Sequence, residues 1–248
     1  MLAAVDGPLA GTGDIVSYTY DASGYVATIT NEVGHVTTVN TTNARGQPTQ
    51  ITDANGVVTT MAYDFQGRLL TVTVNPGASQ AVTSMTYDAI GQITRITKPD
   101  GSYFDYAYSS AKRLTSVTAR DGQKTTYTHD LMGNVLSTTT TDSGGATTFS
   151  ETQTFDELGR LLRNIGANTQ TTVYGYEKND NVKTVTDPRG GIYAYAYDGV
   201  NRLIRETDQE TSQVNLTRDG QDNVTTYAEP LKRVIVLGWD ERSPHTRG

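Results

Sequence analysis

Residues 63–70 read Tyr-Asp-Phe-Gln-Gly-Arg-Leu-Leu, and variants of this stretch recur along the chain. Each copy has an aromatic residue, an aspartate, two variable residues and a glycine, often followed by arginine and leucine. The repeat-defining residues of the clearest copies are Tyr20, Asp21, Gly24, Tyr63, Asp64, Gly67, Arg68, Leu69, Tyr87, Asp88, Gly91, Phe155, Asp156, Gly159, Arg160, Leu161, Tyr197, Asp198, Arg202 and Leu203. With weaker copies included, ten units start at positions 20, 42, 63, 87, 108, 129, 155, 176, 197 and 218, so the common period is 21 residues. A fixed period of this length predicts a repeat architecture.

Each unit contains a second turn, as at residues 53–56 (Asp-Ala-Asn-Gly) and 187–190 (Asp-Pro-Arg-Gly). An aspartate at the first position and a glycine at the last are preferred in type I turns. The segments between turns are short and rich in Thr, Val and Ile, which favours strands over helices. Strands joined by tight turns run antiparallel. We therefore predict an all-β fold, a repetitive antiparallel β-hairpin meander with two strands per unit.

One recurrent feature does not fit a regular strand. Apolar residues lie two and five positions after the turn glycine, as in the pairs Val26 and Ile29, and Ile93 and Ile96. An offset of three places the two side chains on opposite faces of a regular strand. Two explanations remain open at this stage. Either both faces of the sheet are partly buried, or a bulge brings the pair to one face.

The composition excludes several classes of function. The 248 residues include no cysteine, so disulfides, thiolate metal sites and cysteine nucleophiles are excluded. A formal net charge of -7 argues against a nucleic-acid groove, which needs clustered Lys and Arg. No signal peptide and no transmembrane segment is visible in the chain. The 42 threonines and 24 glycines match the strands and turns of the repeat.

The Tyr-Asp-x-x-Gly-Arg-Leu pattern at 21-residue spacing resembles the YD or RHS repeat. That repeat occurs in bacterial Rhs polymorphic toxins, in the C subunits of insecticidal toxin complexes and in animal teneurins. The resemblance covers about residues 14–226, and residues 63–70 and 155–162 carry it best. It implies a curved or spiralling sheet that forms part of a β-shell, with other RHS repeats or an encapsulated polypeptide as partners. It also implies a secreted or cell-surface protein.

The same comparison of motifs suggests a partial array. The core-terminating segment and the toxin region of the Rhs family are not recognisable, and residues 187–190 form an ordinary turn within the repeat. We expect three segments: a lead-in at 1–13, about ten repeats at 14–226 and an atypical tail at 227–248. The tail is interpreted either as out-of-frame sequence or as a capping strand near residues 234–237.

Catalytic, cofactor-binding and metal sites are not predicted. His129 beside Asp130 has the appearance of a metal-binding pair, but His129 occupies the aromatic position of the repeat. Residues 7–13 (Gly-Pro-Leu-Ala-Gly-Thr-Gly) lack the Lys-Ser/Thr of a phosphate-binding loop. Weak calcium binding by turn carboxylates is a minor alternative, since turn formation explains these aspartates without a metal; they are Asp53, Asp100, Asp121 and Asp180.

Seven tyrosines are the best candidates for ligand contact. Within each strand they stand at i and i+2, so they share a face. They are Tyr106, Tyr108, Tyr174, Tyr176, Tyr193, Tyr195 and Tyr197, which we call the tyrosine ladder. The ladder could bind sugar rings or line a cavity, but cross-strand packing is the favoured interpretation.

The sequence thus favours a non-catalytic structural protein, a partial wall of a toxin-encapsulating shell or of a surface scaffold. The alternative is an extracellular carbohydrate-binding or adhesion module that uses the tyrosine ladder. Because a partial array has unpaired edge strands, we also expect self-association.

Overall fold

The computed structural model describes residues 3–5, 7, 14–75, 80–228, 234–240 and 243–247. Within these ranges every regular element is a β-strand. No helix with the length and hydropathy needed to cross a membrane occurs in this part of the chain. The prediction of an all-β fold is therefore confirmed.

The chain divides into two compact units, residues 1–124 and 125–248. The first unit contains β1 (Ala4–Val5), β2 (Val16–Tyr20), β3 (Val26–Thr30), β4 (Val36–Thr42), β5 (Pro48–Thr52), β6 (Val58–Tyr63), β7 (Leu69–Asn75), β8 (Ala81–Tyr87), β9 (Ile93–Thr97), β10 (Tyr103–Tyr108) and β11 (Leu114–Ala119). The second unit contains all but the first residue of β12 (Lys124–His129), followed by β13 (Val135–Thr141), β14 (Thr147–Phe155), β15 (Leu161–Gly166), β16 (Thr171–Tyr176), β17 (Val182–Thr186), β18 (Ile192–Tyr197), β19 (Leu203–Thr207), β20 (Gln213–Arg218), β21 (Val224–Ala228), β22 (Val234–Asp240) and β23 (Ser243–Arg247).

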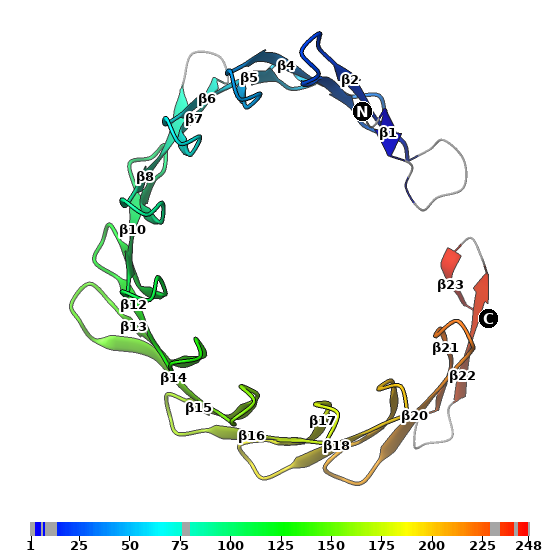
Figure 1. Ribbon diagram of the computed structural model, residues 1–248. Helices are drawn as coiled ribbons and strands as arrows, with labels where there is room; N and C mark the ends of the chain where they lie inside the picture. Colours follow the sequence, from blue (N-terminus) through cyan, green and yellow to red (C-terminus); the bar gives the residue numbers. More distant parts are fainter. Residues whose placement is uncertain are drawn as a thin grey trace. The chain divides into compact units, whose positions relative to one another are not determined.

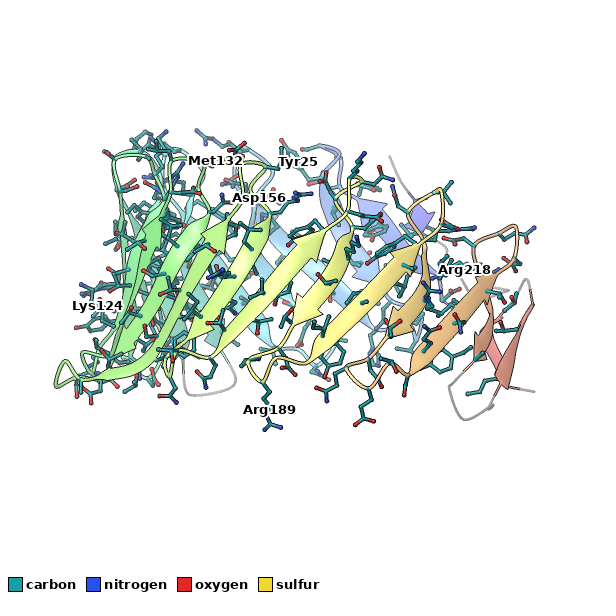
Figure 2. All side chains as sticks on the ribbon, turned by 90° about the horizontal axis from the view of Figure 1, so that it is seen from below. Tyr25, Lys124, Met132, Asp156, Arg189 and Arg218 are labelled. Carbon is teal, nitrogen blue, oxygen red and sulfur yellow. The ribbon has the colours of Figure 1, made fainter. Side chains whose placement is uncertain are left out.

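Strands that are consecutive in the chain lie side by side within each unit (Figure 1). In the first unit β6 pairs antiparallel with β7, and β7 with β8; in the second unit β16 pairs with β17, and β17 with β18. The hairpin turns therefore fall alternately at the two ends of the strands. In the second unit Met132 and Asp156 lie at one end and Arg189 at the other (Figure 2). The predicted antiparallel meander is confirmed.

Both turns of a repeat share one hydrogen-bonding pattern. In the first turn of the unit that starts at Tyr63, the Gly67 N–H donates to the Asp64 carbonyl at 3.0 Å, and Gly67 has a φ of 86°. Asp64 Oδ1 accepts the N–H groups of Gln66 and Arg68 at 2.8 and 2.9 Å. The side chain thus closes an Asx turn while the left-handed position suits glycine. Turn formation is local, which explains why the sequence predicts it well.

A register shift in the first hairpin of most units resolves the apolar pairs with an offset of three. In β8 and β9, Tyr87 pairs with Ile93 and Met85 pairs with Ile96, so one extra residue is inserted between the pairs. Tyr87 and Met85 share a face, and their partners Ile93 and Ile96 therefore share it too. The bulge is the correct explanation.

Threonines occupy the opposite face at these bulges. Thr19 Oγ1 lies 2.6 Å from Thr28 Oγ1, and Thr217 Oγ1 lies 2.9 Å from Thr225 Oγ1 and also contacts Thr226. Two neighbouring residues that both reach Thr217 are what a bulge produces. This arrangement accounts for part of the threonine enrichment.

Neither face of the sheet is covered by a second layer of described residues. Among them Ser116, 8 % exposed, is the one buried residue, and the large apolar side chains are half-buried or exposed. A repeat array of this kind gains its stability from contacts between neighbouring units rather than from a central core. The side chains that join one unit to the next are therefore decisive.

Some predictions fall outside the described residues. They concern residues 1, 2, 6 and 8–13 of the lead-in, residues 76–79 within the repeats and part of the tail, namely 229–233, 241–242 and 248. The segment boundaries at 13 and 226 stay predictions.

Candidate functional site

The aspartate of the repeat binds the arginine that follows the turn glycine. Arg160 Nε lies 2.7 Å from Asp156 Oδ2, and Arg202 Nε lies 2.7 Å from Asp198 Oδ2. Hydrogen bonds from the Arg160 backbone N–H and guanidinium, together with the Leu158 N–H, lower the pKa of Asp156 against the opposing effect of desolvation. The carboxylate is therefore held ionised and fixed in the turn.

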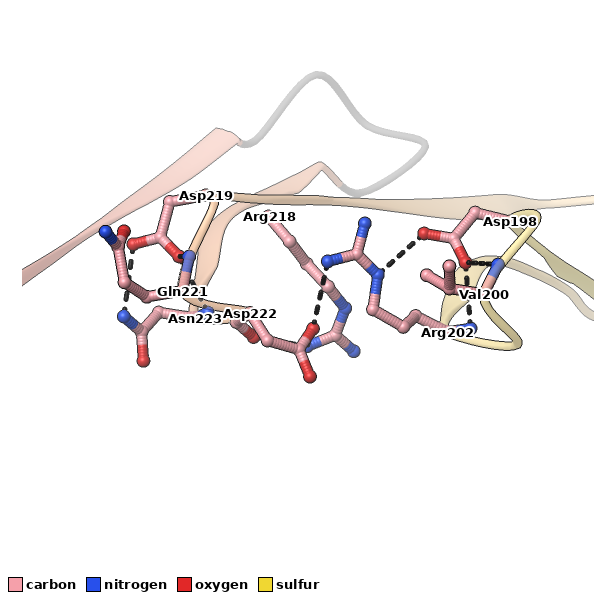
Figure 3. Close-up of polar contacts among 8 residues, drawn as sticks. All are labelled: Asp198, Val200, Arg202, Arg218, Asp219, Gln221, Asp222 and Asn223. Atoms are coloured by element: carbon pink, nitrogen blue, oxygen red, sulfur yellow. Dashed lines mark hydrogen bonds and ion pairs between the residues drawn. The ribbon is translucent and has the colours of Figure 1, made fainter.

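The same arginine reaches the first turn of the next unit, twenty residues further along. Arg160 Nη1 lies 2.7 Å from Asp180 Oδ1, and Arg202 Nη1 donates to Asp222 Oδ1 at 3.3 Å (Figure 3). In three copies with glutamine or asparagine in place of the arginine, the amide makes the equivalent contact. These contacts are Gln47 Nε2 to the Gly67 carbonyl at 2.8 Å, Gln92 Nε2 to the Lys112 carbonyl at 2.9 Å and Asn181 Nδ2 to Asn201 Oδ1 at 2.9 Å.

The turn glycines leave room for this side chain. A Cβ added to Gly67 would lie 3.2 Å from Oε1 of Gln47, which takes the arginine position of the preceding unit, and one added to Gly46 would clash with the Tyr25 ring. Tyr25 occupies the arginine position of the first unit in sequence. The glycine therefore serves both the positive φ of its own turn and the close approach of the preceding unit.

The tyrosine of the repeat makes the reverse connection. Its hydroxyl donates to a backbone carbonyl of the preceding unit. The residue that carries this carbonyl comes directly before the extra residue of the bulge in that unit. These bonds run from Tyr63 to Pro48 at 2.9 Å, from Tyr87 to Leu69 at 2.7 Å, from Tyr176 to Leu161 at 2.8 Å and from Tyr197 to Val182 at 3.0 Å. The arginine of the preceding unit stacks on the same ring, since Arg160 lies 4.6 Å from the Tyr176 centroid.

We call the Tyr, Asp, Gly and Arg contacts between successive units the inter-repeat clamp. Every one of its groups is engaged with the chain itself. A clamp of this kind fixes one hairpin to the next.

The tyrosine ladder lies on the face that carries the apolar pairs. Its members are half-buried. Their cross-strand partners are Val117 for Tyr106, Leu114 for Tyr108, Val185 for Tyr174 and Tyr193, Val182 for Tyr176, Glu206 for Tyr195 and Leu203 for Tyr197. Desolvation raises the pKa of Tyr108, Tyr176, Tyr195 and Tyr197. The hydroxyls of Tyr176 and Tyr197 belong to the clamp. Ligand contact by the tyrosine ladder stays a prediction.

The predicted carboxylate and histidine candidates are placed in strands and turns. His129 ends β12, while Asp130 accepts the N–H groups of Gly133 and Asn134 at 2.8 and 2.9 Å. Among the described residues, no group of three or more His, Asp or Glu side chains could hold a metal ion. Asp53, Asp100 and Asp121 accept backbone N–H groups within their own turns, and Asp180 binds Arg160.

Sequence reasoning missed the role of the arginine and of the tyrosine hydroxyl. The signal was present in the positions directly after the turn glycines, which hold Arg, Gln or Asn in most copies. It also missed a polar interruption of the apolar face, where Gln153 pairs with Asn164. Asn164 Nδ2 donates to Glu151 Oε1 at 2.6 Å, whereas Asn164 Oδ1 is buried without a hydrogen-bond partner.

Comparison with known families and structures supports the repeat assignment. The profile described as Teneurin YD-shell matches residues 10–151, which is more than half of the chain. Comparison with curated proteins gives no match. The crystal structures of TcdB2-TccC3-Cdc42 and of TcdB2-TccC3 are similar in fold, with TM-scores of 0.57 and 0.56 and 12 % sequence identity. The alignments cover 92 % of this chain but only 17 % and 18 % of the matched chains.

Proposed function

The chain belongs to the teneurin YD-shell family, and on this premise we propose that it is a non-catalytic piece of a shell wall in an Rhs-type bacterial protein. In this role it encloses or supports a polypeptide and does not act on it. The protein that contains it would be secreted or displayed at the cell surface. The observation that carries the proposal is the inter-repeat clamp, because it engages the residues that define the repeat in contacts within the wall.

Two further observations support a wall. The sheet is one layer thick in the part of the chain that the structure describes, as enclosure requires. The similar chains of known structure are several times longer than the matched region, so a shell would need further repeats of the same kind. The encapsulated polypeptide and the additional repeats are the partners that the proposal implies.

The proposal is tested by separating stability from ligand binding. Tyr176→Phe removes the hydroxyl that binds the Leu161 carbonyl, so we expect a loss of about 1 kcal/mol in urea unfolding, the usual contribution of one hydrogen bond. Tyr174→Phe is the matched control two residues away on the same strand face, and we expect a smaller loss. Both variants and the unchanged protein are then screened on a glycan array.

We expect no saturable glycan binding by any of the three proteins. A fourth protein, substituted at Tyr195, tests the carbohydrate-binding alternative. If the unchanged protein bound a glycan saturably and this variant did not, with urea unfolding unchanged, the wall function would be contradicted and the alternative supported. Equal stability of Tyr176→Phe and the unchanged protein would remove the clamp as the supporting observation.

A further inference from the structure

One copy of the repeat has a small residue at its aromatic position. In chain order the ten positions hold Tyr, Thr, Tyr, Tyr, Tyr, His, Phe, Tyr, Tyr and Arg, and Thr42 is the exception in size. In four other copies the tyrosine hydroxyl donates to the carbonyl two residues after the last residue of the preceding first turn. The same spacing from Gly24 places the equivalent carbonyl on Val26. Threonine carries no ring, so Thr42 does not make the clamp contact of a tyrosine.

A cavity of about 130 Å³ lies at this place, between the start of β3 and the end of β4. Both ends of the equivalent clamp contact, Val26 and Thr42, belong to its wall. The full lining is Asp21, Val26, Ala27, Val39, Asn40, Thr41 and Thr42. Because an apolar cavity of about 150 Å³ in a protein binds benzene, this one has room for a single aromatic ring.

The strand beside the cavity departs from the repeat. The interval between the aromatic positions of the first two units is 22 residues, one more than the common period. The extra residue is Asn40, which is inserted between Val39 and Thr41, two residues that pair with consecutive residues of β5. Thr52 Oγ1 donates to Asn40 Oδ1 at 2.7 Å and so fixes this bulge. Bulges often lie next to functional sites because they redirect side chains.

The chemistry of the wall suits a neutral aromatic ring. Val26, Ala27 and Val39 provide apolar surface, while Asn40 and the two threonines provide polar groups. A few polar groups within an apolar lining are typical of small ligand sites. The carboxylate of Asp21 places a negative charge beside the cavity, which disfavours an anionic ligand. A phenol is neutral at pH 7, since its pKa is about 10.

We propose that this cavity is a receptor for a phenol ring supplied in trans, namely the side chain of a tyrosine in a polypeptide that the wall contacts. The hydroxyl of that tyrosine donates to the Val26 carbonyl, as Tyr63 does to the Pro48 carbonyl. In each copy that makes this contact, the phenol belongs to a polypeptide. The choice of a polypeptide as partner rests on the proposed wall function, and it names the residue type by which the wall recognises that partner.

Binding of p-cresol, the tyrosine side chain as a free molecule, tests the cavity. Saturation-transfer difference NMR on the full chain should give a dissociation constant of about 1 mM, as expected for so small a ligand. Toluene lacks the hydroxyl and should bind about fivefold more weakly, because the hydrogen bond is lost. Thr42→Tyr supplies the repeat's own ring and should abolish binding, with a fold that circular dichroism checks. Thr147→Tyr, at an exposed strand position in the second unit, is the matched control and should leave binding unchanged.

A pair of peptides tests the source of the phenol. Acetyl-Gly-Gly-Tyr-Gly-Gly-amide should displace p-cresol from the unchanged protein, whereas the same peptide with phenylalanine should displace it more weakly. A tyrosine peptide that fails to displace bound p-cresol overturns the polypeptide as partner in favour of a small phenol.

Three other results overturn the site itself. They are no saturable p-cresol binding, binding that persists in a folded Thr42→Tyr, and equal affinity for p-cresol and toluene in the unchanged protein. The comparison of p-cresol with toluene decides the matter even if Thr42→Tyr does not fold. Each of these failures leaves the stability loss of Tyr176→Phe as it is, so a failure of this site is distinguishable from a failure of the wall function.

Discussion

Two hairpins of the repeat reach the same backbone geometry with different side chains. In the β14–β15 hairpin, Asp156 binds the N–H groups of Leu158 and Arg160, and Gly159 has a φ of 79°. In the β10–β11 hairpin, Ser109 takes the aspartate position and accepts the Arg113 N–H at 3.3 Å. Lys112 takes the glycine position with a φ of 62°.

Both hairpins nevertheless show the same register shift and the same two backbone hydrogen bonds across the turn. The strand ladder therefore imposes the hairpin geometry, and the Asp-Gly pair lowers the cost of adopting it. A weak copy can persist between stronger neighbours because stability in an array is shared between adjacent units. The comparison predicts that removing the glycine at position 159 lowers the free energy of unfolding, whereas introducing a glycine at position 112 raises it.

The largest expected effect is at the glycine position of the β14–β15 hairpin. Gly159→Ala forces a side chain into the left-handed region and should cost about 1–2 kcal/mol in urea unfolding. An added Cβ has only ordinary contacts, the nearest at 3.7 Å, so the loss reports backbone strain. Gly199→Ala is the control, since Gly199 lies in an equivalent turn, has no positive φ and would meet no atom within 4 Å. Equal losses in the two variants would refute the assignment of the effect to φ.

The opposite substitution in the β10–β11 hairpin should stabilise the protein. Lys112→Gly relieves a left-handed lysine but makes the unfolded chain more flexible, so the net gain is about 0.5–1 kcal/mol. The Lys112 carbonyl that accepts Gln92 Nε2 is kept. Urea midpoints of the two proteins measure the gain. A destabilised Lys112→Gly would mean that the lysine side chain itself makes a contact that outweighs its strain.

These hairpins also show how far the sequence predicts the molecule. The turns, the period and the strands were predicted because Asp, Gly and β-branched residues act over a few positions. The bulge could not be assigned, since it depends on how Ile93 and Ile96 pair with another strand. The clamp joins Arg160 to Asp180 across twenty residues, and only the superposition of successive units brings such positions together.

The smallest expected effect is the pH dependence that Asp156 contributes and Ser109 does not. The pKa of Asp156 is lowered from 3.8 in the folded protein, so the folded state binds the proton less readily than the unfolded chain. Its contribution to stability is present above pH 3.8 and is lost as the pH falls through the lower folded value.

Asp156→Asn keeps an oxygen acceptor for the turn but cannot ionise. The difference between its urea midpoints at neutral and acidic pH should therefore be smaller than that of the unchanged protein, whereas Ser109→Ala should leave the difference as it is. Other turn aspartates with lowered pKa values, among them Asp198 and Asp219, still titrate in both variants, so only part of the pH dependence should disappear. An undiminished pH dependence in Asp156→Asn would show that the carboxylate charge does not stabilise this turn, and the advantage of the β14–β15 hairpin would then rest on Gly159 and on the geometry of the acceptor.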